Sequence, residues 1–330
     1  MQVKNENIKK IALLTSGGDA PGMNAVIRAI VRTAIYNKLE VVGIRNGYSG
    51  LLNKDFIEMK SHTVSKILSR GGTILKSSRC PEFKTKEGRE KAYKNLKEEG
   101  IDALIVNGGD GSFRGADLLE KEFDFPVIGT PCTIDNDIYG TDFTIGFDTA
   151  VNTVIDAVDK IRDTAESHNM LFFVEVMGRH SGFIALNTSI ASGAEVMLLP
   201  ETRTDIVQIC NYLKMERRKE KTSGIIIVAE GDEEGGAEEI AVKIKKRLPD
   251  YETRVTTLGH TQRGGNPTCN DRVLASLLGN KAVYALLTDK HGVMVGRVHN
   301  DIVYTPLEEA YTKKDKIDKS WIEISEIISL

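Results

Sequence analysis

A single carboxylate, Asp110, stands between glycines in the stretch IVNGGDGSFRGA at residues 105–116. The apolar residues before it are typical of a buried strand, and those at 113–119 recur at helical spacing. A strand, a glycine turn and a helix form a phosphate-binding layout, because glycines let backbone N–H groups approach an anion and a helix N-terminus adds positive charge. Ser112 is predicted to cap that helix. An aspartate repels phosphate unless a cation separates them, so Asp110 is a candidate Mg²⁺ ligand beside a nucleotide; the alternative is a tight turn with a solvated aspartate.

The stretch TSGGDAPG at residues 15–22 has the same organisation at the end of the first predicted strand. Gly17 and Gly18 leave room for phosphate. Pro21 and Gly22 are expected to begin a helix that runs to about Asn37. This stretch is therefore a second candidate phosphate loop.

A pair of carboxylates, Asp135 and Asp137, lies beside Thr133 in TIDND, on a predicted loop after a short strand. One aspartate can orient and deprotonate a substrate hydroxyl while the other assists a cation. The alternative is Asx-turn chemistry within a long loop. The spacing alone favours neither.

Cationic side chains follow further predicted strands. Arg179 lies in MGRHSG, and Arg254, His260 and Arg263 lie in RVTTLGHTQRGG. Arginine is always charged and suits phosphate recognition or charge stabilisation in phosphoryl transfer, so these residues predict capture of a phosphorylated substrate. Surface salt bridges are the alternative. Glu230, after another apolar run, is a candidate acceptor for sugar hydroxyls.

Alternating apolar runs and helical patterns must position these groups, and they predict an α/β fold with parallel sheets covered by helices on both faces. In open α/β sheets ligands bind at the carboxyl ends of the strands, where these polar loops fall. Composition does not reveal a domain boundary. The predicted strands are Lys10–Thr15, Val41–Ile44, Ile101–Val106, Val127–Gly129, Leu171–Val176, Val196–Leu199, Gly224–Ala229, Arg254–Leu258 and Val293–Val298.

The composition narrows the classes of function. A length of 330 residues suits one large α/β domain or two medium ones, and a net charge of −3 is not the basic excess of a nucleic-acid-binding protein. The apolar runs are strand-sized, and the first residues lack a secretory apolar region, so we expect neither a membrane span nor export. We expect a reduced protein in the cytoplasm, because none of the cysteines forms a C-x-x-C pair. The four cysteines are Cys80, Cys132, Cys210 and Cys269.

Six stretches together resemble the bacterial ATP-dependent 6-phosphofructokinase family, in that family's order and spacing, from Lys9 to about residue 300. They are TSGGDAPGMNA, GGDGS, TIDND, GTDFTIGFDTA, VEVMGR and GHTQRGG. The resemblance implies two three-layer α/β domains with largely parallel sheets, assembled into a homotetramer. Residues 1–145 plus about 262–312 would bind ATP, and 146–261 plus about 313–330 would bind fructose 6-phosphate.

The resemblance also assigns roles by position. Asp135 would take the proton from the sugar 1-hydroxyl, with Thr133 and Arg179 stabilising the transferring phosphoryl group and Asp110 holding Mg²⁺. Arg254 would reach in from a neighbouring subunit. The implied ATP contacts are Gly18, Arg79, Cys80, Gly109, Asp110, Gly111 and Ser112. The implied fructose 6-phosphate contacts are Thr133, Asp135, Met177, Gly178, Arg179, Glu230, Arg254, His260 and Arg263.

Two positions bear on the phosphoryl donor. Pyrophosphate-dependent relatives typically carry aspartate where this chain has Gly111, and that side chain crowds the space of an ATP α-phosphate. They often carry lysine where this chain has Cys132, while ATP-dependent enzymes usually carry glycine. Both positions therefore favour ATP.

The family's effector site binds ADP or phosphoenolpyruvate between subunits through basic residues. This chain retains Arg28, Arg32, Arg162, Glu195, Lys219 and Lys221. It departs from the pattern at Ser61 and His62 in that site, and at Met170, where an arginine usually contacts the sugar phosphate of the adjacent subunit. From these departures we expect a weak response to effectors and weaker binding of fructose 6-phosphate.

Other functions fit less well. NAD kinases and diacylglycerol kinases also carry a GGDG turn but lack TIDND and GHTQRGG in this arrangement. A Rossmann dehydrogenase needs G-x-G-x-x-G after the first strand, which SGGDAPG does not supply. A non-catalytic sugar-phosphate sensor is expected to lose Asp110 or Asp135, and both are present.

Overall fold

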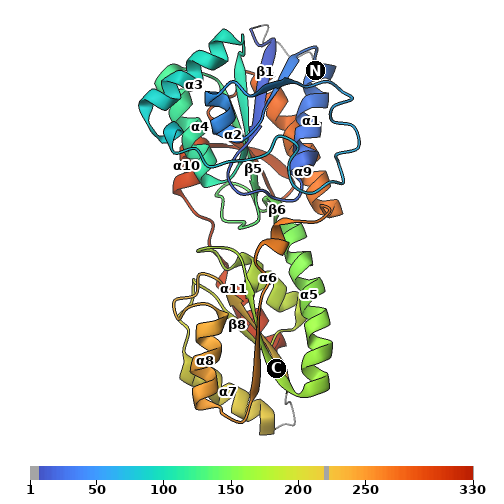
Figure 1. Cartoon of the computed structure of the whole chain (residues 1–330), viewed down its shortest axis with the longest axis vertical. Helices are drawn as coiled ribbons and strands as arrows, with labels where there is room; N and C mark the ends of the chain where they lie inside the picture. Colours follow the sequence, from blue (N-terminus) through green and yellow to red (C-terminus); the bar gives the residue numbers. More distant parts are fainter. Residues whose placement is uncertain (1–6, 219–222, 330) are drawn as a thin grey trace. The chain divides into compact units, whose positions relative to one another are not determined.

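The computed structural model describes residues 7–218 and 223–329, which form two compact units (Figure 1). The first unit contains residues up to Thr133, Ile138–Thr149 and Arg263–Asp315. The second contains Ile134–Asp137, Ala150–Gln262 and the residues from Lys316 onward. Each unit therefore draws on stretches that are far apart in the sequence.

The first unit is built on an eight-stranded sheet of order β12-β11-β5-β4-β1-β2-β3, with β6 beside β5. Its central strands pair in parallel and are largely buried, because most of their residues are apolar and both faces are covered. The strands are β1 Lys10–Thr15, β2 Glu40–Ile44, β3 Phe56–Glu58, β4 Ala103–Gly108, β5 Val127–Thr133, β6 Ile145–Gly146, β11 Val293–Val298 and β12 Asp301–Pro306.

Helices cover both faces of this sheet (Figure 1). On one face, a core that includes Leu14, Val106, Phe113 and Leu307 lies between the strands and α2, α3, α4 and α10. On the other face α1 packs along α9. The elements are α1 Met23–Tyr36, α2 Gly47–Leu52, the 3₁₀ turn η1 Glu82–Lys84, α3 Lys86–Glu98, α4 Asp110–Phe123, α9 Cys269–Leu287 and α10 Leu307–Thr312.

The second unit has a four-stranded parallel sheet of order β10-β7-β9-β8. A core that includes Phe173, Ile226, Ile240 and Cys210 joins this sheet to α7 and α8, while α6 packs on β9 and β8 and contacts α11. The elements are α5 Phe147–His168, β7 Met170–Val176, α6 Phe183–Ser192, β8 Val196–Leu198, α7 Ile206–Arg218, β9 Gly224–Ala229, α8 Ala237–Arg247, β10 Glu252–Thr257, the 3₁₀ turn η2 Gly259–Arg263 and α11 Lys319–Ile328.

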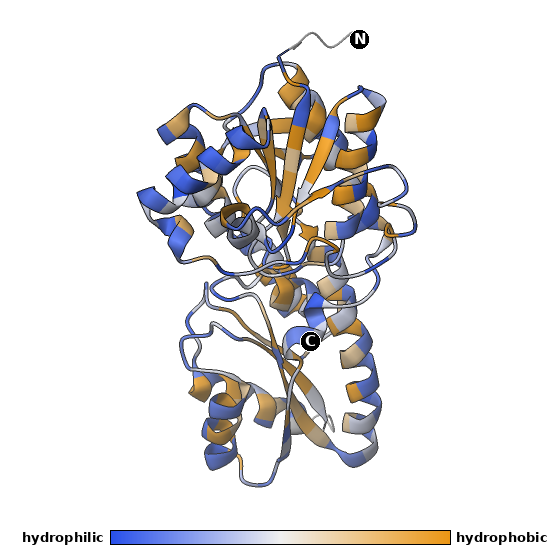
Figure 2. Cartoon of the chain, turned by 45° about the horizontal axis from the view of Figure 1, so that its top comes forward, coloured by the Kyte–Doolittle hydropathy of each residue, from blue (hydrophilic) through white to orange (hydrophobic). Residues whose placement is uncertain are grey.

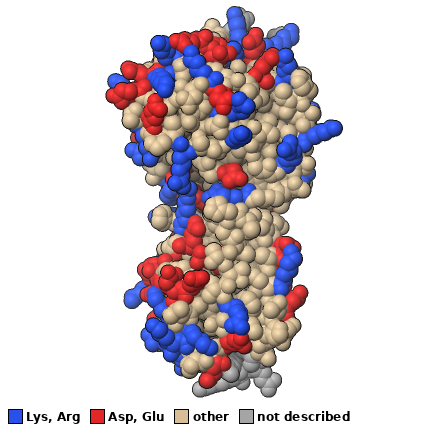
Figure 3. Space-filling view, in the orientation of Figure 1, with Lys and Arg blue, Asp and Glu red and all other residues tan. Residues whose placement is uncertain are grey.

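The hydropathy of the ribbon follows this layering. Figure 2 shows apolar residues along the strands of each sheet and polar residues on the outer sides of the helices. On the face seen in Figure 3, basic and acidic side chains are interspersed over both units. Within the described residues, no helix is long and apolar enough to cross a membrane.

The expected α/β fold with largely parallel sheets is confirmed, and each predicted strand is present. Strands β3, β6 and β12 were not predicted. Strands β3 and β12 pair antiparallel to their neighbours at the two edges of the first sheet. Strand β5 extends to Thr133 rather than ending at Gly129, so the prediction that Thr133 lies on a loop is wrong.

Two predicted helix starts also need correction. Ser112 does not cap α4; it lies inside the first turn, and the residue in the cap position is Gly109, with an extended backbone. Helix α1 begins at Met23, with Gly22 as its cap residue in a left-handed conformation (φ 107°). In both cases the cap position is a glycine, which has no side chain to offer the first-turn N–H groups.

Candidate active site

The GGDGS turn joins β4 to α4 in the first unit. A side chain at position 108 would place its Cβ 2.5 Å from Oγ of Ser112 and 2.6 Å from the carbonyl oxygen of Ser16, so this position needs glycine. The carbonyl of Ser112 accepts a hydrogen bond of 2.6 Å from the buried hydroxyl of Tyr48. The hydrogen bond from Tyr48 thus fixes the turn, which lies at the N-terminus of α4.

Asp110 is the first residue of α4, and its side chain is about half exposed. The Gly111 N–H donates to its Oδ1 at 2.7 Å, and the Lys314 ammonium lies 3.4 Å from its Oδ2. A Cβ at Gly111 would meet no described atom within 4 Å. The carboxylate therefore stands beside open space at a helix N-terminus.

The loop after β1 lies against Arg263. The Arg263 Nη1 donates to the carbonyl oxygen of Asp19 at 3.0 Å, and a Cβ on Gly18 would fall 2.5 Å from that nitrogen. The arginine is nearly buried. Gly18 and Arg263, which are far apart in the sequence, are thus in contact within this unit.

Two further predicted residues precede η1. Arg79 is exposed and Cys80 is half-buried. Their segment is held by Phe83, whose ring stacks on Tyr48 with centroids 3.8 Å apart. A Cβ at Gly115 would lie 3.0 Å from the Phe83 ring. Tyr48 and Phe83 were not predicted, because they belong to none of the motifs.

The end of β5 brings Thr133 to the GGDGS turn. A Cβ on Gly109 would lie 3.7 Å from Cβ of Thr133, and the Thr133 carbonyl accepts a bond of 2.7 Å from Oγ1 of Thr144. Cys132, one residue earlier, is buried. Burial raises the pKa of its thiol to about 12, so it is neutral at physiological pH.

Asp135 and Arg179 come together in the second unit. The Asp135 carboxylate is buried, and its Oδ2 lies 3.8 Å from Nε of the exposed Arg179. The hydroxyl of Ser181 donates to the backbone carbonyl of Asp135 at 2.8 Å. A carboxylate and a guanidinium, both predicted for phosphoryl transfer, are therefore adjacent.

Glu230 holds the backbone that carries Arg179. Its Oε1 accepts hydrogen bonds from the Gly178 N–H at 3.3 Å and the Arg179 N–H at 2.8 Å. Arg179 has a left-handed backbone (φ 54°). A Cβ at Gly231 would fall 1.8 Å from the Arg179 carbonyl oxygen, which explains the glycine after Glu230. The predicted substrate residues on these two loops thus support one another.

The GHTQRGG segment forms η2, where His260 is exposed. Gln262, a residue of this motif with no predicted role, is fully buried and accepts a hydrogen bond of 3.1 Å from the Met177 N–H. Arg254, on β10, is exposed and pairs with Glu252 of the same strand. The ion pair and hydrogen bonds described for the Arg254 side chain thus all lie within β10.

The predicted effector residues fall in separate places. Arg28 and Arg32 lie one turn apart on α1, and burial together with Arg32 lowers the pKa of Arg28. Arg162 lies 3.4 Å from Glu195 and donates to the carbonyls of Ser192 and Gly193. Lys219 and Lys221 lie outside the described residues. Ser61 and His62 are exposed, and Met170 is half-buried at the start of β7.

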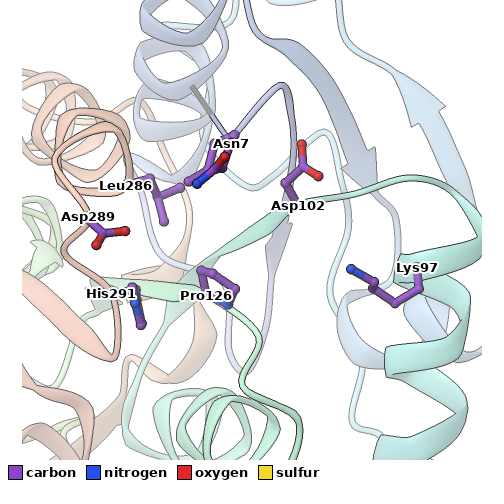
Figure 4. Close-up of a pocket in the computed structure, with 8 residues that line it drawn as sticks. Asn7, Lys97, Asp102, Pro126, Leu286, Asp289 and His291 are labelled. Atoms are coloured by element: carbon purple, nitrogen blue, oxygen red, sulfur yellow. The ribbon is translucent and has the colours of Figure 1, made fainter. Parts of the chain in front are cut away.

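A cavity of about 250 Å³ lies elsewhere in the first unit (Figure 4). Ile8, Asp102 and Pro126, which line it, precede β1, β4 and β5, so it lies at the amino ends of these strands. Asp102 accepts hydrogen bonds from the N–H groups of Lys9 and Lys10. This carboxylate fixes the start of β1, and the cavity is distinct from the glycine loops.

Known proteins resemble this chain over most of its length. A family model described as phosphofructokinase matches residues 10–286. The chain is 54% identical over 323 residues to ATP-dependent 6-phosphofructokinase 2 of Bacteroides thetaiotaomicron, covering 98% of this chain and 99% of that one. It is 51% identical to ATP-dependent 6-phosphofructokinase 1 of Thermus thermophilus, covering 98% and 100%.

Solved structures share the fold. Phosphofructokinase from Saccharomyces cerevisiae superimposes with a TM-score of 0.87 at 37% identity over 97% of this chain, which spans about half of that longer chain (46%). A pyrophosphate-dependent phosphofructokinase from Marinobacter aquaeolei gives a TM-score of 0.86 at 23% identity, covering 97% and 88%. The family model matches most of this chain, and two relatives that align over nearly their whole length are 54% and 51% identical to it. This chain therefore belongs to the phosphofructokinase family.

Proposed function

We infer that this chain is an ATP-dependent 6-phosphofructokinase. It transfers the γ-phosphoryl group of ATP to the 1-hydroxyl of fructose 6-phosphate, giving fructose 1,6-bisphosphate and ADP, the committed step of glycolysis. The observation that carries this inference is the 54% identity, over nearly the whole of both chains, to a relative named for that activity. The adjacency of Asp135 and Arg179 supports it independently.

In the proposed mechanism Asp135 is the general base. Its carboxylate is buried and next to Arg179, so it is pre-positioned and needs little reorganisation to accept the proton of the 1-hydroxyl. As that oxygen attacks, Arg179 and Thr133 stabilise the charge of the transferring group. Arg179 exchanges its contact with Asp135 for the phosphoryl oxygens, which leaves the base free to act.

The proposed nucleotide contacts are Gly18, Arg79, Cys80 and the turn from Gly109 to Ser112. The open space at Gly111 and the neutral thiol of Cys132 support ATP as the donor. The N-terminus of α4 suits an anionic phosphate, because it carries partial positive charge and its cap residue, Gly109, offers no side chain.

Mg²⁺ is the proposed cofactor. The described residues contain no group of three or more His, Cys, Asp or Glu side chains that could hold a metal alone. A single half-exposed carboxylate fits this ion, since Mg²⁺ is usually bound through one or two carboxylates plus substrate phosphates. Asp110 would hold it. When bound, the ion supplies charge that neutralises the ATP phosphates.

Fructose 6-phosphate is proposed to contact Met177, Gly178, Glu230, His260 and Arg263, with Arg254 contributed by a neighbouring subunit of a homotetramer. Glu230 supports this proposal because one of its oxygens orients the Gly178–Arg179 backbone while its side chain stays exposed. The first unit would then be the ATP-binding domain and the second the sugar-phosphate-binding domain.

An effector site for ADP or phosphoenolpyruvate is proposed around Arg28, Arg32 and Arg162, with Glu195, Lys219 and Lys221. Arg162 already binds Glu195 and two carbonyls, and Ser61 and His62 replace basic and aromatic contacts. We therefore expect a weak response to either effector, because allosteric coupling needs contacts that differ between two states.

The purified protein tests this function directly. With fructose 6-phosphate and Mg²⁺, ATP and pyrophosphate are offered in parallel assays that measure fructose 1,6-bisphosphate. ATP is expected to support turnover at least about tenfold better, a difference of ~1.4 kcal/mol in transition-state free energy. Equal or faster turnover with pyrophosphate would contradict the donor assignment, and no product with either donor would contradict the activity.

A further inference from the structure

The segment Met177–Ser181, called the substrate loop below, follows β7 and contains proposed substrate contacts and Arg179. The Ser181 N–H donates to the Gly178 carbonyl at 2.9 Å, which closes a tight turn. Gly178 and Arg179 both have positive φ, 141° and 54°. A left-handed arginine costs energy, so surrounding contacts must hold this conformation.

One contact holds the first residue of the substrate loop. Gln262 is 0% exposed, and its Oε1 accepts from the Met177 N–H at 3.1 Å while its Nε2 donates to the Gly259 carbonyl at 3.0 Å. A buried amide that satisfies both of its ends fixes the two backbones it joins. Gln262 therefore ties the substrate loop to η2, which carries His260.

Another contact holds the last residue of the same loop. Ser181 is buried, and its Oγ donates to the Asp135 carbonyl oxygen at 2.8 Å. This bond joins the substrate loop to the backbone of the proposed base. The carboxylate of Asp135 and the guanidinium of Arg179 thus reach each other from two backbones that Ser181 links directly.

We propose that Ser181 and Gln262 are positioning residues of the phosphoryl transfer, acting at opposite ends of the substrate loop. Ser181 orients Asp135, and Gln262 orients Met177 and, through η2, the sugar-phosphate contacts. This proposal rests on the proposed function. Because the two ends serve different steps, the two residues have different kinetic signatures: kcat for Ser181 and the KM for fructose 6-phosphate for Gln262.

The Ser181 arm uses Ser181→Ala, which removes one neutral hydrogen bond. We expect kcat to fall about threefold to tenfold, with the KM values for both substrates within about twofold of wild type. Ser189→Ala is the matched control. Ser189 is equally buried in the same unit, but its hydroxyl bonds to nothing within residues 7–218 and 223–329. The control is expected to keep the wild-type kcat.

The Gln262 arm uses Gln262→Met, which keeps the length of the side chain and removes both hydrogen bonds. We expect the KM for fructose 6-phosphate to rise about tenfold while kcat and the KM for ATP change little. Asn95→Leu is the matched control, because Asn95 is a buried amide that donates to the Leu51 and Leu52 carbonyls of the other unit. It is expected to lower thermal stability and leave both KM values unchanged.

If Gln262→Met does not fold, Gln262→Glu tests the proposed role of Gln262 instead. It keeps an acceptor for the Met177 N–H but replaces the donor to the Gly259 carbonyl. A raised KM for fructose 6-phosphate at unchanged kcat supports the proposal, and an unchanged KM overturns it.

The wild type is assayed first with ATP, fructose 6-phosphate and Mg²⁺, and an inactive wild type overturns the proposed function itself. With an active wild type, the positioning proposal is overturned if Ser181→Ala matches Ser189→Ala in kcat. It is also overturned if the Ser181 and Gln262 variants alter kcat and all KM values together, as general loosening of the unit would.

Discussion

The guanidinium of Arg263 occupies the space that a side chain at Gly18 would need. A Cβ at this glycine would lie 2.5 Å from Nη1 and 3.0 Å from Cζ, and the same Nη1 donates to the Asp19 carbonyl. A larger residue at position 18 would therefore require this guanidinium to move. The contact joins a proposed ATP-binding residue to a proposed sugar-phosphate-binding residue.

Gly18→Ala is expected to displace Arg263, because the guanidinium must move to admit a methyl group. The unfolding free energy should fall by about 1–3 kcal/mol, as in other overpacked sites. The KM for fructose 6-phosphate should rise with it. Thermal unfolding and steady-state kinetics measure the two effects, and a variant with wild-type stability and KM would show that the arginine relaxes without consequence.

Gly111→Ala is expected to have the opposite effect on stability. The position lies in the first turn of α4 and faces open space, so alanine should stabilise the helix by about 0.5–1 kcal/mol. If the ATP phosphates use that space, the KM for ATP rises in the same variant. A more stable enzyme with an unchanged KM for ATP would place the nucleotide elsewhere.

Asp135→Asn keeps the shape of the side chain and removes the base. We expect kcat to fall by roughly 10²- to 10⁴-fold with smaller changes in KM. Single-turnover assays at saturating ATP and fructose 6-phosphate measure the chemical step. A kcat near that of wild type would reassign the base, with Asp137 as the next candidate.

Met170 stands at the start of β7, opposite Glu252 of β10, where the family usually has arginine. A charge-assisted hydrogen bond contributes roughly 1.5–3 kcal/mol, so its absence should weaken fructose 6-phosphate binding by about 10- to 100-fold and lower cooperativity. Met170→Arg should therefore tighten half-saturation with little change in kcat. Unchanged half-saturation in a variant that folds and assembles like the wild type would mean that another group, such as His168, binds the phosphate.

Asp271 is a buried carboxylate that accepts from the Gly146 N–H at 2.7 Å and the Thr149 N–H at 2.8 Å. Burial raises its pKa, although these hydrogen bonds oppose the shift. The folded protein thus holds this proton to higher pH than the unfolded chain does. The contribution of protonated Asp271 to the free energy of unfolding is complete at pH values below the ordinary pKa of an aspartate. This contribution is lost as the pH rises through the raised pKa.

Asp271→Asn should remove the pH-dependent loss of stability. It should also place the amide N–H₂ group against the N–H groups of Gly146 and Thr149, which donate to the carboxylate. At neutral pH we expect about 1–3 kcal/mol of destabilisation from the unsatisfied donors. Chemical denaturation of both proteins from pH 4 to 7 measures this difference. Parallel stability curves across that range would exclude Asp271 as a titrating group.

The sequence predicts those elements of the fold that have a clear local pattern of apolar residues. Strand β4 is fully buried and reads as a continuous apolar run, whereas the second half of β5, Thr130–Thr133, is polar and proline-containing and so resembles a loop. Strands β3 and β12 are short or partly exposed edge strands, whose pairing depends on neighbours distant in the chain.

The site was predictable as a set of residue types but not as a set of contacts. The motifs single out Asp110, Asp135 and Arg179 as candidates, because their residue types suit phosphoryl transfer. The bond from Met177 to Gln262 joins residues 85 positions apart, and no local pattern encodes it. The same holds for Tyr48, whose bond to Ser112 spans 64 positions.

The interleaving of the two units bears on how the chain folds as it leaves the ribosome. Strand β5 acquires its outer neighbour β11 only after residue 293, and α1 packs on α9, where Gly279 lies against Val26 and Ala29. The sheet that starts first must therefore wait, with β5 and α1 uncovered, for most of synthesis. Residues 150–262 complete the second sheet as one continuous insertion. The second sheet can thus form before the first is complete, and the earliest strands depend longest on protection from aggregation.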